Sequence, residues 1–408
     1  MPASSRTTRS PHAYQPPRKS KRKSPRWAKL FVVLGALMMV ASGGALVAAK
    51  VVFSKVEAAV PQENLLGDAG IQGTTIEGPV NLLLVGLDQR EEQNDDSVRA
   101  DTIMMVHIPT SHDQAYLVSV PRDLRVKIPD YPKSNFKGWS TKINASFQGG
   151  YKGPGTEIEK RKRGMELLAL TIRNTWGISF DGAAIIDFVG FEAVLKELGG
   201  VTMCVDRPAE AIHLAKDKNG KVIVNSEAGP VWYDDTQGKV RGIPPGGSIY
   251  KYSVGCQRMT PELALEYSRL RKGTCCPNGD YDRQRHQQQL IKQIVKEATS
   301  KGVLTDLGKL NRVMQAAGKA FVLDTRGVSV ADYLVTFKDI ADQMTQVKTN
   351  AGKVNTIEGS SDEALTPDSV EMMAAFKNKT LPTWLLSHMD FIGTDSNGAT
   401  SASPSPGP

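Results

Sequence analysis

The stretch Asn81–Leu87 reads N-L-L-L-V-G-L, and this almost unbroken apolar run predicts a strand that is buried within a sheet. Ile103–Ile108 and Ala115–Val120 are apolar runs of the same kind and predict two more buried strands. Val201–Val205 predicts a further strand. We therefore expect a central β-sheet built largely from these segments.

Helical patterns alternate with the strands. Thr156 and Glu159 form a capping-box pattern before a helix that should run to about Thr175. Further helices are expected over Phe188–Leu198, from Thr260 with Pro261 at the first helical position, from about Asp282 to Ser300, over Val328–Val347 and over Asp368–Asn378. This alternation predicts an α/β or mixed α+β fold, a central sheet flanked by helices. Residues 205–250 are interpreted as an insertion or a long loop.

The net charge of +8 is unevenly distributed along the 408 residues. Residues 1–29 contain nine Lys and Arg residues and no acidic residue, so the rest of the chain carries a net charge of −1. The basic character therefore belongs to a tail, and a folded surface for nucleic acid is not indicated.

Residues 30–49 form an uncharged, mostly apolar stretch of 20 residues, long enough to cross a membrane as one helix. The basic flank before it predicts a cytoplasmic N-terminus and places everything after it outside the membrane. A cleaved signal peptide is the less favoured alternative, because its apolar region is usually only ~7–15 residues long. We thus expect a single-pass protein of the cell membrane with an extracellular domain.

These features divide the chain into five segments. They are a basic, disordered cytoplasmic tail at 1–29, a transmembrane helix at 30–49, a stalk at 50–77, an extracellular folded domain at 78–390 and a disordered tail at 391–408. Within the domain, residues 78–300 hold the site-like motifs. Residues 301–390 are expected to be a helical part that completes the same domain without chemistry of its own.

The four cysteines all follow the predicted anchor, at Cys204, Cys256, Cys275 and Cys276. Outside the cytosol disulfides are the expected state, and four cysteines allow three pairings. A bridge between the adjacent Cys275 and Cys276 is geometrically strained, which disfavours one of the three. A zinc site is not indicated, because no zinc-ligand spacing is present.

Arginines and aspartates recur at turns beside the predicted strands and helix ends. They are Asp88, Arg99, Asp101, Arg122, Arg269, Arg271, Asp280, Asp282, Arg283 and Arg285. The planar guanidinium group grips phosphate, and ligands collect at strand ends in such folds. Carboxylates beside a phosphate indicate a shared divalent cation. The pattern predicts a site for a polyanion, most simply a pyrophosphate.

Each of these residues also has an ordinary structural interpretation. Arg283 shares a helix face with Gln287, and it could instead form a salt bridge within the domain. Arg269 and Arg271 could be a solvated basic helix end, which the helix dipole also favours. Asp88 could simply form the turn after a strand, and Asp101 could be a partner of Arg99.

Six segments read N-L-L-L-V-G-L-D-Q-R, R-A-D-T-I-M-M-V, L-V-S-V-P-R-D, T-K-I-N-A-S-F, A-L-E-Y-S-R-L-R and G-D-Y-D-R-Q-R-H-Q-Q-Q. They occur in the order and spacing of the LytR-CpsA-Psr family, which the chain resembles over about residues 78–300. The resemblance implies a transferase that moves a glycopolymer, such as teichoic acid or arabinogalactan, from an undecaprenyl- or decaprenyl-pyrophosphate carrier to peptidoglycan. The extra cysteines and the basic Ser/Pro-rich tail favour an actinobacterial member.

The same resemblance implies the ligands of the site. Mg²⁺ would be held by Asp88 and Asp101, and the lipid tail would lie in an apolar pocket of the sheet-and-helix core. The pyrophosphate would be bound by Arg99, Arg122, Arg269, Arg271, Arg283 and Gln287. The expected partners are the carrier-linked glycopolymer, peptidoglycan and the membrane, with no nucleic acid.

The expected chemistry needs charge neutralisation and in-line positioning more than covalent help, because a sugar hydroxyl attacks a phosphate. Arg122 and Mg²⁺ would supply the positive charge, and Asp101 or Asp123 would accept the proton. Two other functions stay open. One is a non-catalytic scaffold or regulator that binds the carrier, and the other is a pyrophosphatase that uses water as the acceptor.

Overall fold

The computed structural model of the chain describes residues 61–71, 76–87, 98–226, 229–234, 236–304, 306–330, 332–333 and 340–393. The predicted basic tail, the predicted anchor and nearly all of the predicted C-terminal tail lie outside these residues. In the part of the chain that is described, no helix is both long and apolar enough to cross a membrane.

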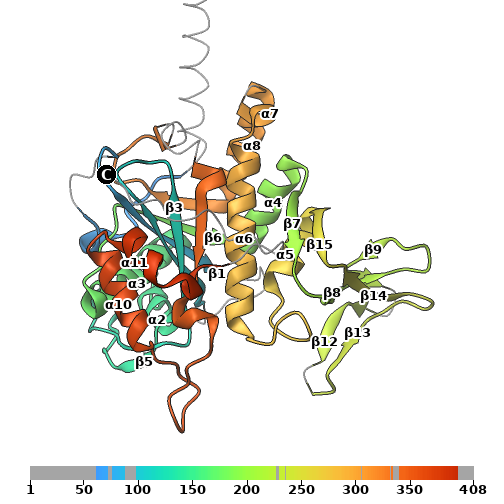
Figure 1. The fold of residues 1–408 in the computed structure, drawn as a ribbon, viewed down its shortest axis with the longest axis horizontal. Helices are drawn as coiled ribbons and strands as arrows, with labels where there is room; N and C mark the ends of the chain where they lie inside the picture. The colour runs from blue at the N-terminus through green and yellow to red at the C-terminus, as the bar shows by residue number, and fades with distance from the viewer. Residues whose placement is uncertain are drawn as a thin grey trace, which may run out of the picture. The chain divides into compact units, whose positions relative to one another are not determined.

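A six-stranded mixed sheet forms the centre of the domain, in the order β16-β6-β1-β2-β3-β17 (Figure 1). Its strands are β1 (Val80–Leu87), β2 (Ala100–Ile108), β3 (Ala115–Val120), β6 (Gly182–Asp187), β16 (Phe321–Asp324) and β17 (Met344–Val347). The strands β1, β2 and β3 are antiparallel neighbours, whereas β6 runs parallel to β1 and β17 parallel to β3. The predicted mixed α+β fold with a central sheet is confirmed.

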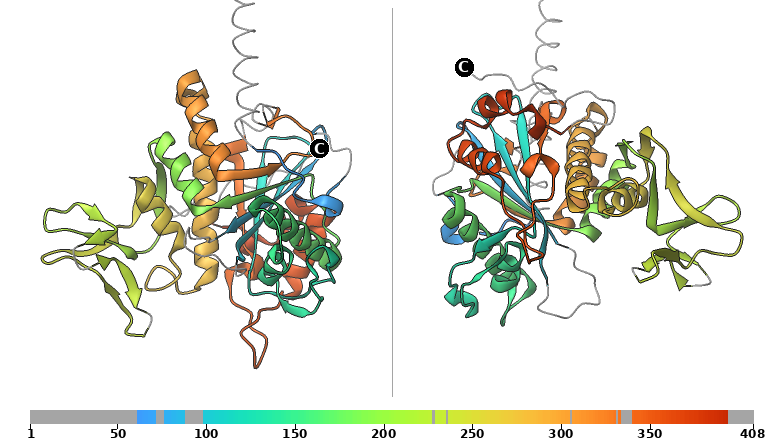
Figure 2. Two further views of the ribbon diagram at one scale, coloured as in Figure 1. Left: turned by 180° about the vertical axis from the view of Figure 1, so that it is seen from behind. Right: turned by 60° about the horizontal axis from the view of Figure 1, so that its bottom comes forward.

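Helices cover both faces of this sheet (Figures 1 and 2). One face packs against α2 (Asn144–Tyr151), α3 (Glu157–Trp176), α10 (Pro367–Lys377) and α11 (Leu381–Ser387). The helices on the other side are α4 (Phe188–Leu198), α5 (Pro261–Arg269), α6 (Asp280–Ala298), α7 (Lys301–Leu304) and α8 (Leu307–Ala320). The short 3-10 turns are η1 (Gly67–Ala69), η2 (Pro132–Ser134), η3 (Ile340–Gln343), η4 (Thr349–Gly352) and η5 (Met389–Phe391).

The two faces of β1 are buried to different degrees. Leu83, Val85 and Leu87 are fully buried in the core with α2 and α3. Leu82 and Leu84 point to the opposite face, toward α6, and are only half-buried. Successive side chains of a strand alternate between faces, so β1 separates a tightly packed core from a more loosely filled side. The candidate site lies on that second side.

The capping box before α3 is formed as predicted. The Thr156 N–H donates to Oε2 of Glu159 at 2.7 Å, and the Glu159 N–H donates to the Thr156 hydroxyl at 3.4 Å. We expect Thr156→Ala to lower the free energy of unfolding by about 1 kcal/mol, because the Glu159 N–H loses the hydroxyl that accepts its hydrogen bond. Urea denaturation of the variant measures this, and an unchanged midpoint would show that the cap contributes nothing.

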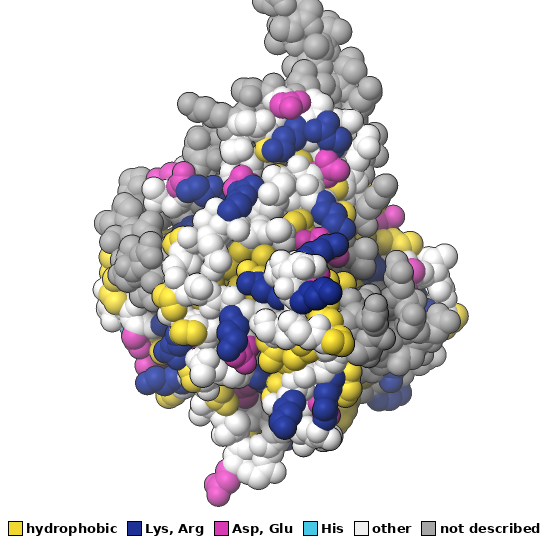
Figure 3. Space-filling view, turned by 90° about the vertical axis from the view of Figure 1, so that its right-hand side faces the viewer, with side chains coloured by type: hydrophobic (Ala, Val, Ile, Leu, Met, Phe, Trp, Pro, Cys, Tyr) yellow, Lys and Arg dark blue, Asp and Glu magenta, His cyan; other side chains and the backbone are white. Residues whose placement is uncertain are grey.

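Residues 205–250, interpreted from the sequence as an insertion or a long loop, form a small lobe rich in strands, seen at the right of Figure 1, so the loop alternative is wrong. Its strands are β8 (Ala209–Lys216), β9 (Val222–Ile223), β10 (Asn225–Ser226), β11 (Gly229–Pro230), β12 (Trp232–Asp234), β13 (Lys239–Arg241) and β14 (Ser248–Tyr252). Its turns carry the Gly, Asp and Pro residues that resembled a loop. Figure 3 views the molecule from this side, and on the described part of that face Lys and Arg side chains are interspersed with apolar and uncharged ones.

Two other boundaries differ from the sequence analysis. Part of the predicted stalk belongs to the domain, because Leu65 and Leu66 are fully buried in the core and Gln62 bridges to Leu323. The predicted helix Val328–Val347 is also wrong, since its last four residues form the strand β17. All four residues of β17 are buried, which suits a strand at the side of the sheet better than an amphipathic helix.

The structure contains the pairing of cysteines that the sequence analysis disfavoured. Cys204 and Cys256 lie directly opposite each other on β7 (Val201–Val205) and β15 (Gly255–Met259) and form a disulfide. The adjacent Cys275 and Cys276 form the other bridge. The second bridge lies in the loop between α5 and α6, the helices that carry Arg269 and Arg283.

Candidate functional site

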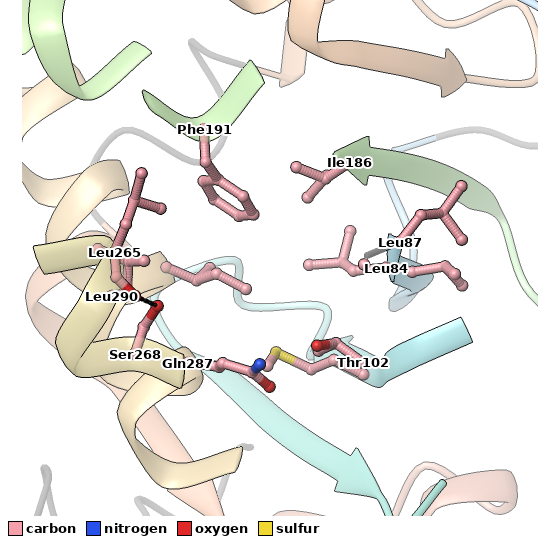
Figure 4. Close-up of a pocket in the computed structure, with 13 residues that line it drawn as sticks. Leu84, Leu87, Thr102, Ile186, Phe191, Leu265, Ser268, Gln287 and Leu290 are labelled. Carbon is pink, nitrogen blue, oxygen red and sulfur yellow. Dashed lines mark hydrogen bonds between the residues drawn. The ribbon is translucent and has the colours of Figure 1, made fainter. Parts of the chain in front are cut away.

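An apolar pocket lies between the sheet and the helices α4, α5 and α6 (Figure 4). Its empty volume is about 480 Å³. It is lined by Leu84, Val85, Gly86, Leu87, Thr102, Met104, Ile186, Phe191, Leu265, Ser268, Gln287, Leu290 and Ile291. A lining of this apolar character suits the hydrocarbon part of a ligand.

Residues of β1 form one wall of this pocket. Leu84 and Gly86 are two residues apart and therefore face the same side of the sheet, toward the pocket. A Cβ atom on Gly86 would lie 2.9 Å from Cβ of Thr102 on the neighbouring strand. A larger residue would therefore have to displace Thr102. The glycine therefore lets the Thr102 side chain lie close against β1 in the wall of the pocket.

Gln287 marks the polar end of the pocket. Its side chain is buried, and Oε1 has no hydrogen-bond partner among the described residues. Gln287 lies one helical turn after Arg283 on α6, so the two side chains share one face of the helix. The pocket thus leads along α6 toward the arginine.

Two arginines from distant parts of the chain meet beyond this end. Nη2 of Arg283 lies 2.5 Å from Oδ1 of Asp280 and donates to the carbonyl of Asp101 at 3.2 Å. Arg122, which follows β3, forms an ion pair with Asp101, and its Nε lies 3.8 Å from the carboxylates of Asp123 and Asp280. The shared acids Asp101 and Asp280 therefore hold both guanidinium groups in one cluster.

Each guanidinium group retains an unused donor. Nε of Arg122 and Nε of Arg283 are buried, and neither donates a hydrogen bond to the described part of the chain. An unsatisfied buried donor costs about 1–3 kcal/mol, more when it is charged. An anion that accepted hydrogen bonds from both guanidinium groups would remove that cost. The cluster is therefore a candidate anion-binding site.

Burial and neighbouring charge set the pKa values of these arginines. Burial acts to lower the pKa of Arg122, but Asp280 and Asp101 outweigh it, so the pKa is raised. For Arg283 burial is the largest influence and lowers the pKa, with Asp280 opposing it and Arg122 adding to it. Both groups stay cationic near neutral pH, since an arginine pKa is too high to be reached there.

The other predicted site residues differ in how exposed they are and in the partners they have. Arg271 is exposed in the loop after α5, near enough for its charge to lower the pKa of Arg283. Arg269 is half-buried at the end of α5. Arg99 is exposed, and its Nε donates to Gln148 of α2 at 3.1 Å. The predicted metal ligand Asp88 lies outside the described residues.

Two members of the sequence pattern have structural partners. Arg285 forms an ion pair with Asp206 at 2.9 Å. Oδ2 of Asp282 accepts a hydrogen bond from the Asn278 N–H at 2.8 Å, which helps to begin α6. Arg285 also lies 3.5 Å from Oδ1 of Asp282, so both residues have partners within the domain.

The sequence analysis missed two charged residues beside the cluster. Nζ of Lys142, on β5 (Ser140–Lys142), lies 2.9 Å from Oδ1 of Asp123. Glu363 is buried, and the charges of Asp123 and Asp280 help to raise its pKa, although burial is the larger cause. The T-K-I-N segment pointed to Lys142, whereas nothing in the local sequence marks Glu363.

One carboxylate of the predicted magnesium site is within the described residues. Asp101 begins β2 beside Arg122, and its side chain is 24% exposed. Mg²⁺ usually takes one or two protein carboxylates and completes its shell with phosphate oxygens and water, so Asp101 fits as one ligand. Among the described residues there is no group of three or more His, Cys, Asp or Glu side chains that could hold a metal ion by themselves.

An apolar pocket whose lining residue Gln287 lies one helical turn from Arg283 is a candidate binding site for an amphiphile with an anionic head group. The chain belongs to the LytR_cpsA_psr family, whose sequence model matches residues 50–378. This confirms the resemblance that the six motifs indicated.

The chain is similar to several proteins of known role. It is 25% identical over 346 residues to the cell wall biosynthesis protein LcpA of Corynebacterium glutamicum, covering 78% of this chain and 59% of LcpA. It is 24% identical to the polyisoprenyl-teichoic acid–peptidoglycan teichoic acid transferase TagU of Bacillus anthracis, covering 70% of this chain and 76% of TagU. The chain therefore spans less than two thirds of the length of LcpA.

Solved structures share the fold. The protein gbs0355 of Streptococcus agalactiae superposes with a TM-score of 0.54 at 19% identity, covering 82% of this chain and 95% of that one. TagT bound to LIIa-WTA superposes with a TM-score of 0.50 at 20% identity, covering 77% and 95%. At these identities the likeness shows the common fold alone.

Proposed function

We propose that this protein transfers a glycopolymer from a polyprenyl-pyrophosphate carrier to peptidoglycan and releases polyprenyl phosphate. The observation that carries the proposal is that Gln287, which lines the apolar pocket, lies one helical turn after Arg283, and that Arg283 shares the acids Asp101 and Asp280 with Arg122. A pocket for hydrocarbon near a cluster for phosphate suits the two halves of such a carrier. Family membership and the transferase name of TagU support the reaction class.

The reaction follows from this arrangement. The polyprenyl chain lies in the pocket, and Arg122 and Arg283 bind and neutralise the pyrophosphate. An acceptor hydroxyl forms a new oxygen–phosphorus bond to the phosphate that carries the glycan, and the bond from that phosphorus to the bridging oxygen breaks. The bridging oxygen leaves with polyprenyl phosphate. Asp123 or Asp101 takes the proton of the hydroxyl, while Arg99, Arg269 and Arg271 extend the positive surface for the anion.

Magnesium is part of the proposal, with Asp101 and Asp88 as its protein ligands. When bound, Mg²⁺ would share the charge of the pyrophosphate and of the leaving phosphate. We expect EDTA to lower the transfer rate by about 100-fold or more, because stabilisation of transition-state charge by a metal contributes several kcal/mol. Excess Mg²⁺ should restore the rate. Full activity in EDTA would contradict the proposed metal site, but it would not argue against anion binding by the arginine cluster.

The proposal places the domain outside the cell membrane, held there by the predicted anchor at 30–49. The carrier lipid is itself a membrane component, so an anchored domain meets its donor at the membrane surface. Peptidoglycan, the proposed acceptor, lies on the same side.

The products of one incubation test the function. The full-length protein in detergent is mixed with a polyprenyl-pyrophosphoryl oligosaccharide and peptidoglycan oligomers, and the glycan is followed by mass spectrometry. Glycan phosphate on peptidoglycan is the expected product. Inorganic phosphate without transfer would instead support a pyrophosphatase, and bound carrier without any product would support a non-catalytic scaffold.

A further inference from the structure

A buried tyrosine–glutamate pair lies beside the arginine cluster. The hydroxyl of Tyr281 donates to Oε2 of Glu363 at 2.6 Å, and Nδ2 of Asn350 donates to the Tyr281 hydroxyl at 3.0 Å. Tyr281, Glu363 and Asn350 are 5%, 6% and 3% exposed. The pair links α6 to a C-terminal segment for which the sequence analysis expected no chemistry.

The main chain of Glu363 is fixed to the other side of the cluster. Its N–H donates to the carbonyl of Asp123 at 2.9 Å, and its carbonyl accepts from the Arg125 N–H at 2.9 Å. These bonds hold Glu363 against the turn that carries Arg122. One residue therefore contacts both arginine-bearing segments, the turn through its main chain and α6 through its side chain.

Tyr281 connects Glu363 to Arg283, the second arginine of the cluster, through its neighbour Asp280. It follows Asp280 in the first turn of α6, and Asp280 is the residue that pairs with Arg283 and lies 3.8 Å from Arg122. A shift of Tyr281 would move Asp280 with it. The separation of the two guanidinium groups thus depends on where the Tyr281 hydroxyl is held.

We propose that Glu363 and Tyr281 are positioning residues of the pyrophosphate site, which set the distance between Arg122 and Arg283. The inference rests on the proposed function, because it assumes that both arginines bind one pyrophosphate. Neither residue needs to touch the substrate. A misplacement of about 1 Å in such a site can lower the rate by about 100-fold, so a remote pair can have a large effect.

The buried environment of Tyr281 and Glu363 strengthens the hydrogen bond between them. Burial is the main cause of a raised pKa for the Glu363 carboxyl, and Asp123 and Asp280 add to it. Hydrogen bonds are electrostatically stronger in such a low-dielectric setting than at an exposed surface. The bond from Tyr281 also partly offsets the raised pKa of Glu363 by favouring the carboxylate.

The chain contains a matched control pair. The Tyr131 hydroxyl donates to Oε2 of Glu166, also at 2.6 Å, and Tyr131 is 3% exposed. Glu166 lies on α3, which carries none of the predicted site residues. Tyr131→Phe and Tyr281→Phe therefore remove the same hydroxyl from the same kind of bond, and only the second bond is beside the arginines.

The test measures two properties of the full-length variants in detergent. Binding of farnesyl pyrophosphate is followed by calorimetry, and glycan transfer by mass spectrometry, with the unfolding midpoint as a check on the fold. We expect Tyr281→Phe to lower kcat/KM for transfer by about tenfold or more, and Tyr131→Phe by less than about twofold, at similar losses of stability. Glu363→Gln, which keeps an oxygen to accept the bond, should retain at least about fivefold more activity than Glu363→Leu.

The outcomes separate this inference from the proposed function. Arg122→Ala serves as the reference, because it removes a guanidinium group outright. If it binds farnesyl pyrophosphate like the wild type, the arginine cluster is not the site and both proposals are wrong. If it loses binding while Tyr281→Phe and Tyr131→Phe behave alike, or if Glu363→Gln and Glu363→Leu are equally active, the positioning role alone is wrong.

Discussion

Arg122→Ala is expected to lower the rate of glycan transfer by about 10- to 100-fold or more. The removed guanidinium group would leave the pyrophosphate without a charged hydrogen bond of ~1.5–3 kcal/mol. It would also leave Asp101 without its ion-pair partner. The measurement is kcat/KM with a carrier-linked oligosaccharide, since this ratio reports the loss of transition-state stabilisation.

Arg258→Ala is the control for this prediction. Arg258 has an exposed guanidinium group that pairs with Glu297 and hydrogen-bonds to the carbonyl of Gly199, away from the arginine cluster. Its removal should leave the rate within about twofold of the wild type, as surface ion pairs contribute little. Wild-type rates in Arg122→Ala, Arg269→Ala and Asp101→Ala together would show that the anion binds elsewhere.

Leu84→Trp is expected to weaken the binding of an isoprenyl pyrophosphate by about 100-fold. Leu84 lines the pocket from β1, and the larger indole would fill space that the chain needs. Each CH₂ group kept in water costs about 0.8 kcal/mol, so exclusion of four such groups costs ~3 kcal/mol. Calorimetric titration with farnesyl pyrophosphate measures the effect.

Two comparisons make this result specific to the pocket. Leu84→Met nearly conserves volume and should bind the lipid with about the wild-type affinity. Inorganic pyrophosphate, which has no chain, should bind Leu84→Trp and the wild type equally. Equal loss of both ligands would mean that the substitution disturbs the arginine cluster, and no loss of either would mean that the chain lies outside the pocket.

The elements predicted correctly are those in which the signal lies within the segment itself. The structure has α4 at Phe188–Leu198 and β3 at Ala115–Val120, as the sequence analysis expected, and the cap at Thr156 is formed. In these segments the apolar periodicity and the capping residues determine the element without reference to the rest of the chain.

The mistaken elements depend on pairing between distant segments. Met344–Val347 is a strand because it pairs with β3, more than 200 residues earlier, and its composition alone fits a helix as well. Leu65 and Leu66 read as part of a stalk because their burial comes from contacts with α3 and the sheet. The small lobe at 205–250 is made of short strands whose turns dominate the composition.

In the candidate site, too, local sequence patterns indicated some residues, whereas others depend on contacts between distant segments. Arg122 and Arg283 could be singled out because arginines and aspartates recur at turns beside the predicted strands and helix ends, and the structure brings the two arginines together over shared acids. The vicinal bridge at Cys275 and Cys276 was disfavoured on strain alone. Glu363 could not be found, because its role comes from a hydrogen bond to a residue 82 positions away.

A crystal structure of the protein with an isoprenyl pyrophosphate and Mg²⁺ tests the central claim most directly. The account predicts that the phosphate groups contact the guanidinium groups of Arg122 and Arg283, with the hydrocarbon chain in the pocket beside Leu84 and Leu265. A pyrophosphate bound away from both arginines, or a chain lying outside that pocket, would contradict it.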